Sequence, residues 1–238
     1  FAVVWFGSPH DPFKARPEDK DAFKSLNEAS ANHYGELVAM DRSLGTLRQK
    51  LREFALADNT LLVFCSDNGG LPSIKPDTVG GLRGNKASVY EGGLRVPGII
   101  EWPSVIAPRV TQYPACTMDL FPTIADLLEL DAGGFIQPLD GMSLKPLLDN
   151  PAASWDKPAR TQVSRGTPTL TGEGIGKNPW FMGRSIRNER YRYTEWDSGK
   201  KGVQLYDYDT DPNELKNLAD DPKHADIVKQ MKALLPKK

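Results

Sequence analysis

Two unbroken apolar runs near the start of the chain flank a long segment with helical periodicity. Residues 1–6 and 60–65 are continuous hydrophobic stretches, as in strands that are buried on both faces of a parallel sheet. Between them, apolar residues in 29–56 recur at spacings of three and four, which predicts one amphipathic helix. Strand, helix and strand in this order indicate a parallel α/β sheet.

The remaining hydrophobic pattern divides the chain into two parts. A third apolar run at residues 96–102 and a helical pattern at 118–130 extend the α/β part. Short β-rich runs separated by turns then follow at residues 161–164, 180–186, 190–196 and 203–208. They predict an antiparallel sheet, closed by a helix at 222–235. We therefore expect an α/β domain over residues 1–150 and a small α+β subdomain over 151–238.

Composition and charge exclude several classes of partner. The 238 residues are 39% hydrophobic and 26% charged, which is ordinary for a globular protein. Thirty Lys and Arg residues against 31 Asp and Glu leave a formal charge of −1, so no global basic field exists to hold a nucleic acid. No stretch approaches the roughly 18 apolar residues of a membrane span. We expect no nucleic-acid partner and no membrane span.

A polar pair follows the second apolar run directly. Asp67 and Asn68 come after the run at 60–65 and before Gly69 and Gly70. Open α/β sheets bind their ligands at the carboxyl ends of strands, and carboxylate and amide oxygens suit Ca²⁺ or Mg²⁺. A metal site is therefore one interpretation. A plain turn is the alternative, because Asn-Gly is a common turn dipeptide.

Two loop residues are further candidates. His10 follows the run at residues 1–6 between two prolines and is a candidate general acid, metal ligand or structural histidine. Lys86 lies in a glycine-rich stretch, where its ammonium group binds a phosphate or sulfate as a point charge or remains a solvated surface group. The other histidines, His33 and His224, are expected on helix surfaces.

Several short motifs in a fixed order are more specific than these single residues. They are Ser-Pro-His-x-Pro at residues 8–12, Ser-Asp-Asn-Gly-Gly at 66–70, Leu-Arg-Gly-Asn-Lys at 82–86, Tyr-Glu-Gly-Gly-Leu-Arg-Val-Pro at 90–97 and Thr-Met-Asp-Leu-Phe-Pro-Thr at 117–123. With the long helix between the first two, this order resembles the type I sulfatases of the alkaline-phosphatase superfamily. The resemblance implies an α/β fold with an alkaline-phosphatase-like mixed or parallel sheet flanked by helices, plus a small C-terminal antiparallel sheet with a packing helix.

The same resemblance implies roles for the candidate residues. Asp67 and Asn68 would supply two calcium ligands. His10 would contact the sulfate and serve as the acid for the departing oxygen, and Lys86 would hold the sulfate. The implied reaction is hydrolysis of sulfate monoesters, with Ca²⁺ as cofactor, Mg²⁺ as a second option, and a small-molecule or carbohydrate sulfate ester as substrate. The implied location is periplasmic or secreted.

Other charged residues of the glycine-rich stretch are expected to have a structural role. A loop of this composition needs internal hydrogen bonds to keep its shape, and Arg83, Glu91 and Arg95 are the residues expected to provide them. The particular ester and the oligomeric state are left open by the sequence.

The nucleophile that the resemblance implies is not encoded in this chain. The family uses a formylglycine made from Cys or Ser in a Cys/Ser-x-Pro/Ala-x-Arg signature, which neither Cys65 nor Cys116 matches. The paired N-terminal acidic calcium ligands are also missing, and calcium takes about six to eight oxygens. We therefore expect a fragment of a longer enzyme that is inactive by itself. The alternatives are a phosphonate or phosphate ester hydrolase of the same superfamily, or a non-catalytic anion- or carbohydrate-binding relic.

Overall fold

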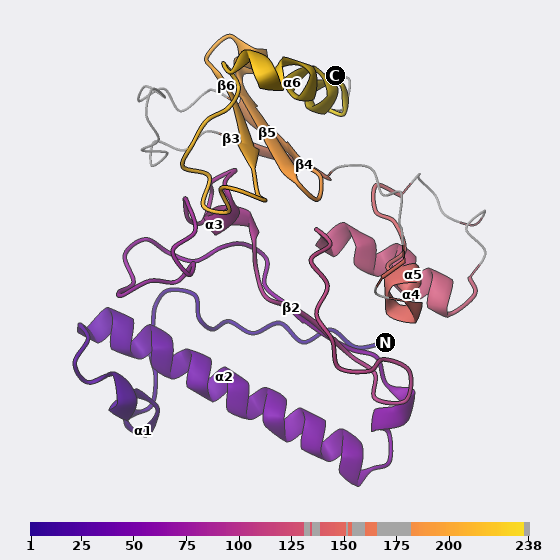
Figure 1. Cartoon of the computed structure of the whole chain (residues 1–238). Coiled ribbons are helices and arrows are strands. Elements are labelled where there is room, and N and C mark those ends of the chain that lie inside the picture. Colours follow the sequence, from indigo (N-terminus) through magenta and orange to yellow (C-terminus); the bar gives the residue numbers. More distant parts are fainter. Residues whose placement is uncertain (131–133, 135–138, 151, 154–159, 166–181, 236–238) are drawn as a thin grey trace. The chain divides into compact units, whose positions relative to one another are not determined.

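The chain folds into two compact units that are discontinuous in sequence. A computed structural model describes all residues except 131–133, 135–138, 151, 154–159, 166–181 and 236–238 (Figure 1). The first unit comprises Phe1–Gly81 and Arg95–Val105, and the second comprises Leu82–Leu94 and Ile106–Lys238. These units follow contacts in space, and the predicted division into residues 1–150 and 151–238 stays a prediction.

The first unit is built on one long helix and a two-stranded antiparallel sheet. Its helices and strands are α1 (Pro17–Lys20), α2 (Glu28–Glu53), β1 (Leu62–Cys65) and β2 (Gly98–Glu101), with short 3-10 turns at Asp21–Phe23 and Ala57–Asn59. The side chain of Asn27 caps α2 by accepting a hydrogen bond from Ser30 N at 3.0 Å. In β1 and β2, Leu62 pairs with Glu101 and Cys65 pairs with Gly98.

The structure confirms the predicted long helix and corrects the first predicted strand. Helix α2 lies within three residues of the prediction at each end. Residues 1–6 form no strand, and their side chains are exposed, with Trp5 at 91%. A strand needs a neighbour for its backbone N–H and C=O groups, and none of the described residues pairs with this run. The strand–helix–strand unit predicted from residue 1 is therefore wrong for the described part of the chain.

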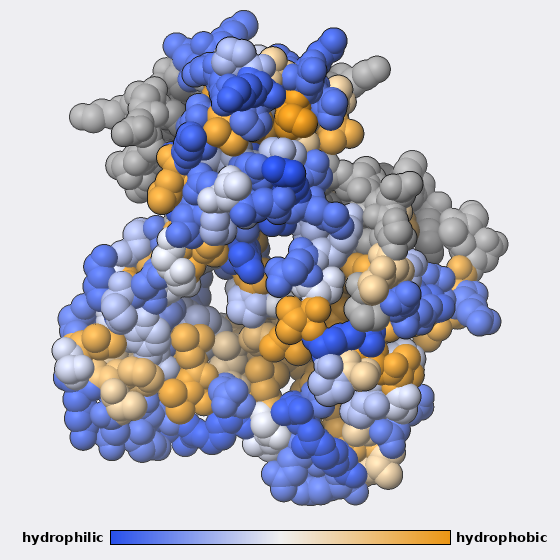
Figure 2. All heavy atoms as spheres, in the orientation of Figure 1, coloured by the Kyte–Doolittle hydropathy of each residue, from blue (hydrophilic) through white to orange (hydrophobic). Residues whose placement is uncertain are grey.

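Burial divides α2 into two halves. Its first three turns contain the buried residues Ser30, Ala31, Asn32, His33, Gly35 and Glu36. Farther along, Val38 and Leu47 are about 40% exposed, and Figure 2 shows hydrophobic surface over this helix.

Among the described residues, no helix is long and apolar enough to cross a membrane.

The second unit holds the predicted C-terminal sheet. Its strands are β3 (Arg160–Arg165), β4 (Met182–Arg187), β5 (Tyr191–Trp196) and β6 (Val203–Asp207), and its helices are α3 (Glu91–Leu94), α4 (Leu120–Leu127), α5 (Lys145–Asp149) and α6 (Ala225–Ala233). Short 3-10 turns lie at Thr117–Asp119, Asp197–Gly199 and Pro222–His224. The four strands are antiparallel in the order β3-β4-β5-β6. The antiparallel sheet predicted from the sequence is confirmed.

Two hydrophobic clusters stabilise this sheet. Helix α6 packs beside β5 (Figure 1), over a core of Ile186, Tyr193, Leu205, Leu218, Met231 and Leu235. A second cluster joins the segment before α3 to the sheet through Val89, Tyr90, Trp196 and Tyr206, all at most 2% exposed. This second cluster attaches the glycine-rich stretch of the sequence to strands more than 100 residues farther along the chain.

Candidate functional site

His10 lies in an exposed turn of the first unit. Its backbone N–H donates to Gly7 O at 3.1 Å, and its ring Nδ1 lies 2.8 Å from Asp11 O. Since a carbonyl oxygen accepts, this contact requires the proton on Nδ1. The opposite ring nitrogen, Nε2, is then the atom that could exchange a proton with a substrate.

A second histidine supports this turn from α2. His33 is 5% exposed, its ring meets Phe13 edge-on at 5.2 Å, and it hydrogen-bonds the backbone of Pro9. Burial lowers the pKa of His33 below 6.5, against the opposing effects of Glu36 and the Pro9 bond. The expectation of a surface position is therefore wrong for His33, because the loop around Pro9 and Phe13 packs on this part of α2.

Asp67 and Asn68 occupy the predicted turn directly after β1. Ser66 Oγ donates to Asn68 O at 3.2 Å, and the side chain of Asp67 is exposed. Gly70 approaches Thr78 so closely that a Cβ would collide with the threonine side chain. The glycine thus allows the chain after Asp67 and Asn68 to lie directly against Thr78.

The donor chemistry of this turn suits calcium, but the number of donors does not complete a site. Asp67 and Asn68 offer hard oxygen ligands, as Ca²⁺ or Mg²⁺ requires. In the part of the chain that the structure describes, no group of three or more His, Cys, Asp or Glu residues is placed to hold a metal. Asp67 and Asn68 can therefore act as two ligands of a larger set and not as a site by themselves.

Lys86 lies at the tip of a tight turn in the second unit. Ser88 N donates to Asn85 O at 2.9 Å, so Lys86 and Ala87 are the two central residues. Ala87 has φ of +71°, a left-handed conformation that the third position of a type II turn requires and that usually selects glycine. The Lys86 side chain is exposed, whereas residues 88–93 are buried. Lys86 is therefore exposed at a turn that is followed directly by buried residues.

The segments before and after this turn pack closely through their backbones. Gly92 N donates to Arg83 O at 2.7 Å, and a Cβ on Gly92 would collide with Gly84 O. The backbone before the turn therefore contacts the backbone after it, which explains why position 92 is a glycine.

Arg83 connects the start of the turn to the C-terminal sheet. Its Nη1 donates to Tyr206 OH at 2.5 Å and to Glu214 O at 2.8 Å, and its guanidinium lies 4.0 Å from the ring centroid of Tyr90. Arg83 makes structural hydrogen bonds, but these partners lie in the sheet and the segment after it and not, as the sequence predicted, within the glycine-rich stretch.

Glu91 connects the end of the turn to the same region through a buried charge network. Arg192, with a 2% exposed side chain, makes ion pairs with Glu91 and with Glu214, the latter at 2.7 Å. Burial would raise the pKa of Glu91, but Arg192 and Arg187 outweigh it and hold that pKa below its ordinary value. Burial prevails at Glu214 and raises its pKa despite Arg192. Arg192 is thus a cation shared by two buried carboxyl groups.

The structure brings three of the four candidate residues into the first unit. His10, Asp67 and Asn68 lie there, each on or beside an exposed turn, and Lys86 lies in the second unit. The meeting of all four around one sulfate stays a prediction.

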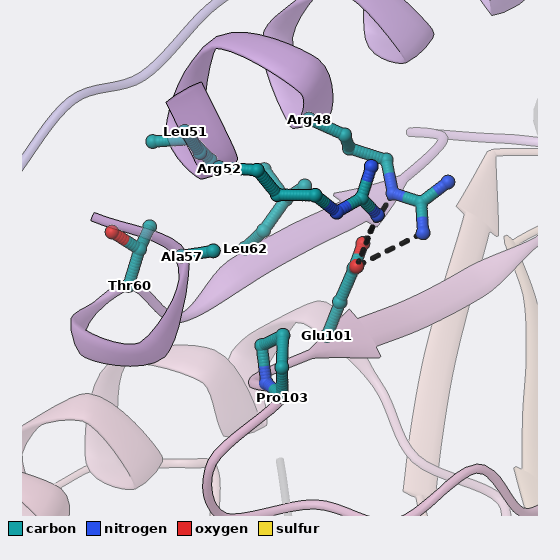
Figure 3. A pocket seen from close by; sticks show the side chains of 8 residues that line it. All are labelled: Arg48, Leu51, Arg52, Ala57, Thr60, Leu62, Glu101 and Pro103. Atoms are coloured by element: carbon teal, nitrogen blue, oxygen red, sulfur yellow. Dashed lines mark hydrogen bonds and ion pairs between the residues drawn. The ribbon is translucent and has the colours of Figure 1, made fainter. Parts of the chain in front are cut away.

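A shallow pocket of the first unit includes none of that unit's candidate residues in its lining. It is lined by Arg48, Leu51, Arg52, Ala57, Thr60, Leu62, Glu101 and Pro103 (Figure 3). Arg48 donates to both carboxylate oxygens of Glu101, at 2.6 and 2.9 Å, and Arg52 also points toward this carboxylate at 3.7 Å. Glu101 neutralises much of the positive charge, so the pocket is a poor site for an anion.

Comparisons with known proteins give a consistent match. A family model described as Sulfatase matches residues 1–130, and one described as N-sulphoglucosamine sulphohydrolase, C-terminal, matches residues 175–238. Steryl-sulfatase of Rattus norvegicus is 39% identical over 150 residues, which are 58% of this chain and 24% of the relative. N-acetylgalactosamine-6-O-sulfatase of Bacteroides thetaiotaomicron is 28% identical over 212 residues, 84% of this chain and 40% of the relative.

Solved structures show the same α/β architecture. Ps i-CgsB in complex with k-i-k-neocarrahexaose has a TM-score of 0.74 and 27% identity, covering 94% of this chain and 46% of that chain. A phosphonate monoester hydrolase of Agrobacterium radiobacter has a TM-score of 0.63 and 26% identity, covering 87% and 41%. The predicted alkaline-phosphatase-like α/β fold is confirmed, and the chain spans less than half the length of these relatives.

Proposed function

Because this chain belongs to the sulfatase family, we propose that it is the C-terminal part of a hydrolase that cleaves sulfate monoesters of carbohydrates. The proposal rests on one observation: the family match over residues 1–130 includes His10, Asp67, Asn68 and Lys86. The formylglycine nucleophile and the remaining calcium ligands would lie in sequence outside these 238 residues.

The residues of this chain fit the charge demands of the reaction. Breaking the ester bond concentrates negative charge on the bridging oxygen, while the other sulfate oxygens remain anionic. The exposed ammonium group of Lys86 would bind those other oxygens. A protonated His10 would keep Nδ1 on Asp11 O and donate its Nε2 proton to the leaving alcohol, a step worth about 10²–10⁴-fold. Asp67 and Asn68 would hold the calcium ion, which supplies further charge neutralisation at the sulfate.

The substrate class is proposed from the names of the relatives. One relative is an N-acetylgalactosamine-6-O-sulfatase, and one structural neighbour was solved with a neocarrahexaose. Both names point to carbohydrate substrates, so we propose a sulfated carbohydrate for this enzyme as well. By the same family resemblance we propose a periplasmic or secreted location.

A phosphonate or phosphate ester is the second candidate substrate. It is favoured by the structural likeness to the phosphonate monoester hydrolase. The two reactions need the same oxyanion contacts, so this chain alone does not distinguish them. Comparing an aryl sulfate with an aryl phosphate as substrates of the full-length enzyme would decide between them. Faster turnover of the phosphate would favour the second candidate.

Lys86→Ala in the full-length enzyme tests the proposed site. Removing one charge-stabilising donor should lower kcat/KM for an aryl sulfate by about 10²–10³-fold. Lys229→Ala is the matched control, because Lys229 is an exposed lysine of the same unit on α6. Equal kcat/KM for the wild type and Lys86→Ala would exclude the proposed role. The 238-residue protein by itself should show no turnover, since it lacks the nucleophile.

A further inference from the structure

One buried residue, Glu214, touches the segment of Lys86 on both sides of the turn. Its backbone oxygen accepts from Arg83 Nη1 at 2.8 Å, and its carboxylate Oε2 accepts from Glu91 N at 2.8 Å. Arg83 precedes Lys86 and Glu91 follows it. A single residue therefore connects the two ends of the turn that exposes the lysine.

The rest of the Glu214 side chain is also fixed. Oε1 lies 2.7 Å from Arg192 Nε and accepts a second bond from Tyr208 OH at 2.7 Å. Both carboxylate oxygens thus have partners, and the residue is fully buried. Two occupied oxygens leave the carboxylate one orientation in which all these bonds form.

The backbone of Glu214 is held in an uncommon conformation. Its φ is +56°, in the left-handed region that glycine and asparagine favour. A buried glutamate persists there when surrounding contacts determine its position, and such outliers gather at functional sites. Here the left-handed conformation accompanies an arrangement in which the carbonyl bonds Arg83 while the side chain bonds Glu91.

From these contacts we propose that Glu214 is a positioning residue for Lys86. It fixes the distance between the two ends of the turn and so fixes where the ammonium group stands. The inference rests on the proposed function, in which Lys86 binds the sulfate. Glu214 does not touch the substrate in this proposal and acts through the turn.

The sheet offers a matched control residue in Glu195. It is also fully buried, and it bonds Arg184 Nε at 3.1 Å and Tyr193 OH at 2.9 Å. These partners lie on β4 and β5, so Glu195→Gln perturbs a buried, ion-paired glutamate within the sheet. Glu214→Gln perturbs one that holds the turn.

Hydrogen exchange of the 238-residue protein tests the inference without any activity. The backbone N–H of Ser88 closes the turn, and the backbone N–H of Gly92 joins the segments on its two sides. We expect Glu214→Gln to speed their exchange at least tenfold, because an amide side chain has one acceptor oxygen in place of two. Arg83→Met, which removes the bond at the other end of the turn, should do the same, whereas Glu195→Gln should leave both amides at the wild-type rate. Wild-type exchange in both Glu214→Gln and Arg83→Met would overturn the inference.

A double-mutant cycle in the full-length enzyme tests the link to Lys86. Glu214→Gln should lower kcat/KM about tenfold when Lys86 is present and less than twofold in the Lys86→Ala background. An equal loss in both backgrounds would show a general structural effect and overturn the inference alone. A Lys86→Ala enzyme with wild-type kcat/KM would instead overturn the proposed function, and the positioning role with it.

Discussion

Replacing Arg192 with methionine should destabilise the second unit severely. The guanidinium lies between Glu91 and Glu214, whose side chains are 5% and 0% exposed. Arg192→Met keeps the approximate length of the aliphatic stem but leaves both carboxyl groups without their shared cation. Removing one partner from a buried ion pair costs about 3–5 kcal/mol. At about 2–4 °C per kcal/mol for a protein of this size, the melting temperature should fall by roughly 6–20 °C.

Thermal unfolding followed by circular dichroism at pH 7 measures this change. Arg190→Met is the control, because Arg190 also bonds a carboxylate, Asp207, but its side chain is 50% exposed and water screens the pair. A third variant combines Arg192→Met with Glu91→Gln and Glu214→Gln, which removes both buried carboxyl groups and should recover part of the loss. A fall in melting temperature no larger than that of Arg190→Met would show that Arg192 does not stabilise the two buried carboxyl groups.

Two further predictions concern a glycine and a histidine. Gly92→Ala should destabilise the protein by about 1–3 kcal/mol in urea unfolding, because the new Cβ would collide with Gly84 O. Gly45→Ala is the control: it lies within helix α2 with open space around it, so it should stabilise the protein by about 0.5–1 kcal/mol. Burial holds the pKa of His33 below the unfolded value of 6.5, so the unfolded chain gains a proton first and wild-type stability should fall as pH drops from 6.5 through the folded pKa. His33→Gln should flatten this dependence between pH 7.5 and 5.5, and an unchanged slope would contradict the assignment.

Local sequence patterns were sufficient to predict most regular elements. Helix α2 follows from apolar spacing, and strand β5 follows from its aromatic and β-branched residues between polar turns. Residues 1–6 show the limit of this reasoning. An apolar run indicates a preference for burial, but it does not say which chain segment will pair with it. The burial of His33 was missed for a related reason, since it depends on the loop that packs over α2.

The sequence was sufficient to identify the candidate site residues, but not the distant residues that hold them in place. The sequence indicated that a glycine-rich loop needs internal partners and identified Arg83 and Glu91 as two of them. It could not indicate Glu214, which lies 131 residues after Arg83, or Arg192, which lies 101 residues after Glu91. The left-handed φ of Ala87 could not be predicted either, because the fold imposes it and alanine does not prefer it.

The separation between Arg83 and Glu214 sets an order of events during synthesis. A ribosome that adds about 5–20 residues per second needs roughly 7–26 s to make the 131 residues between them. Throughout that interval the nascent Lys86 segment exists without the residue that joins its ends. The segment that carries Lys86 can therefore reach its final arrangement only after residue 214 has been made.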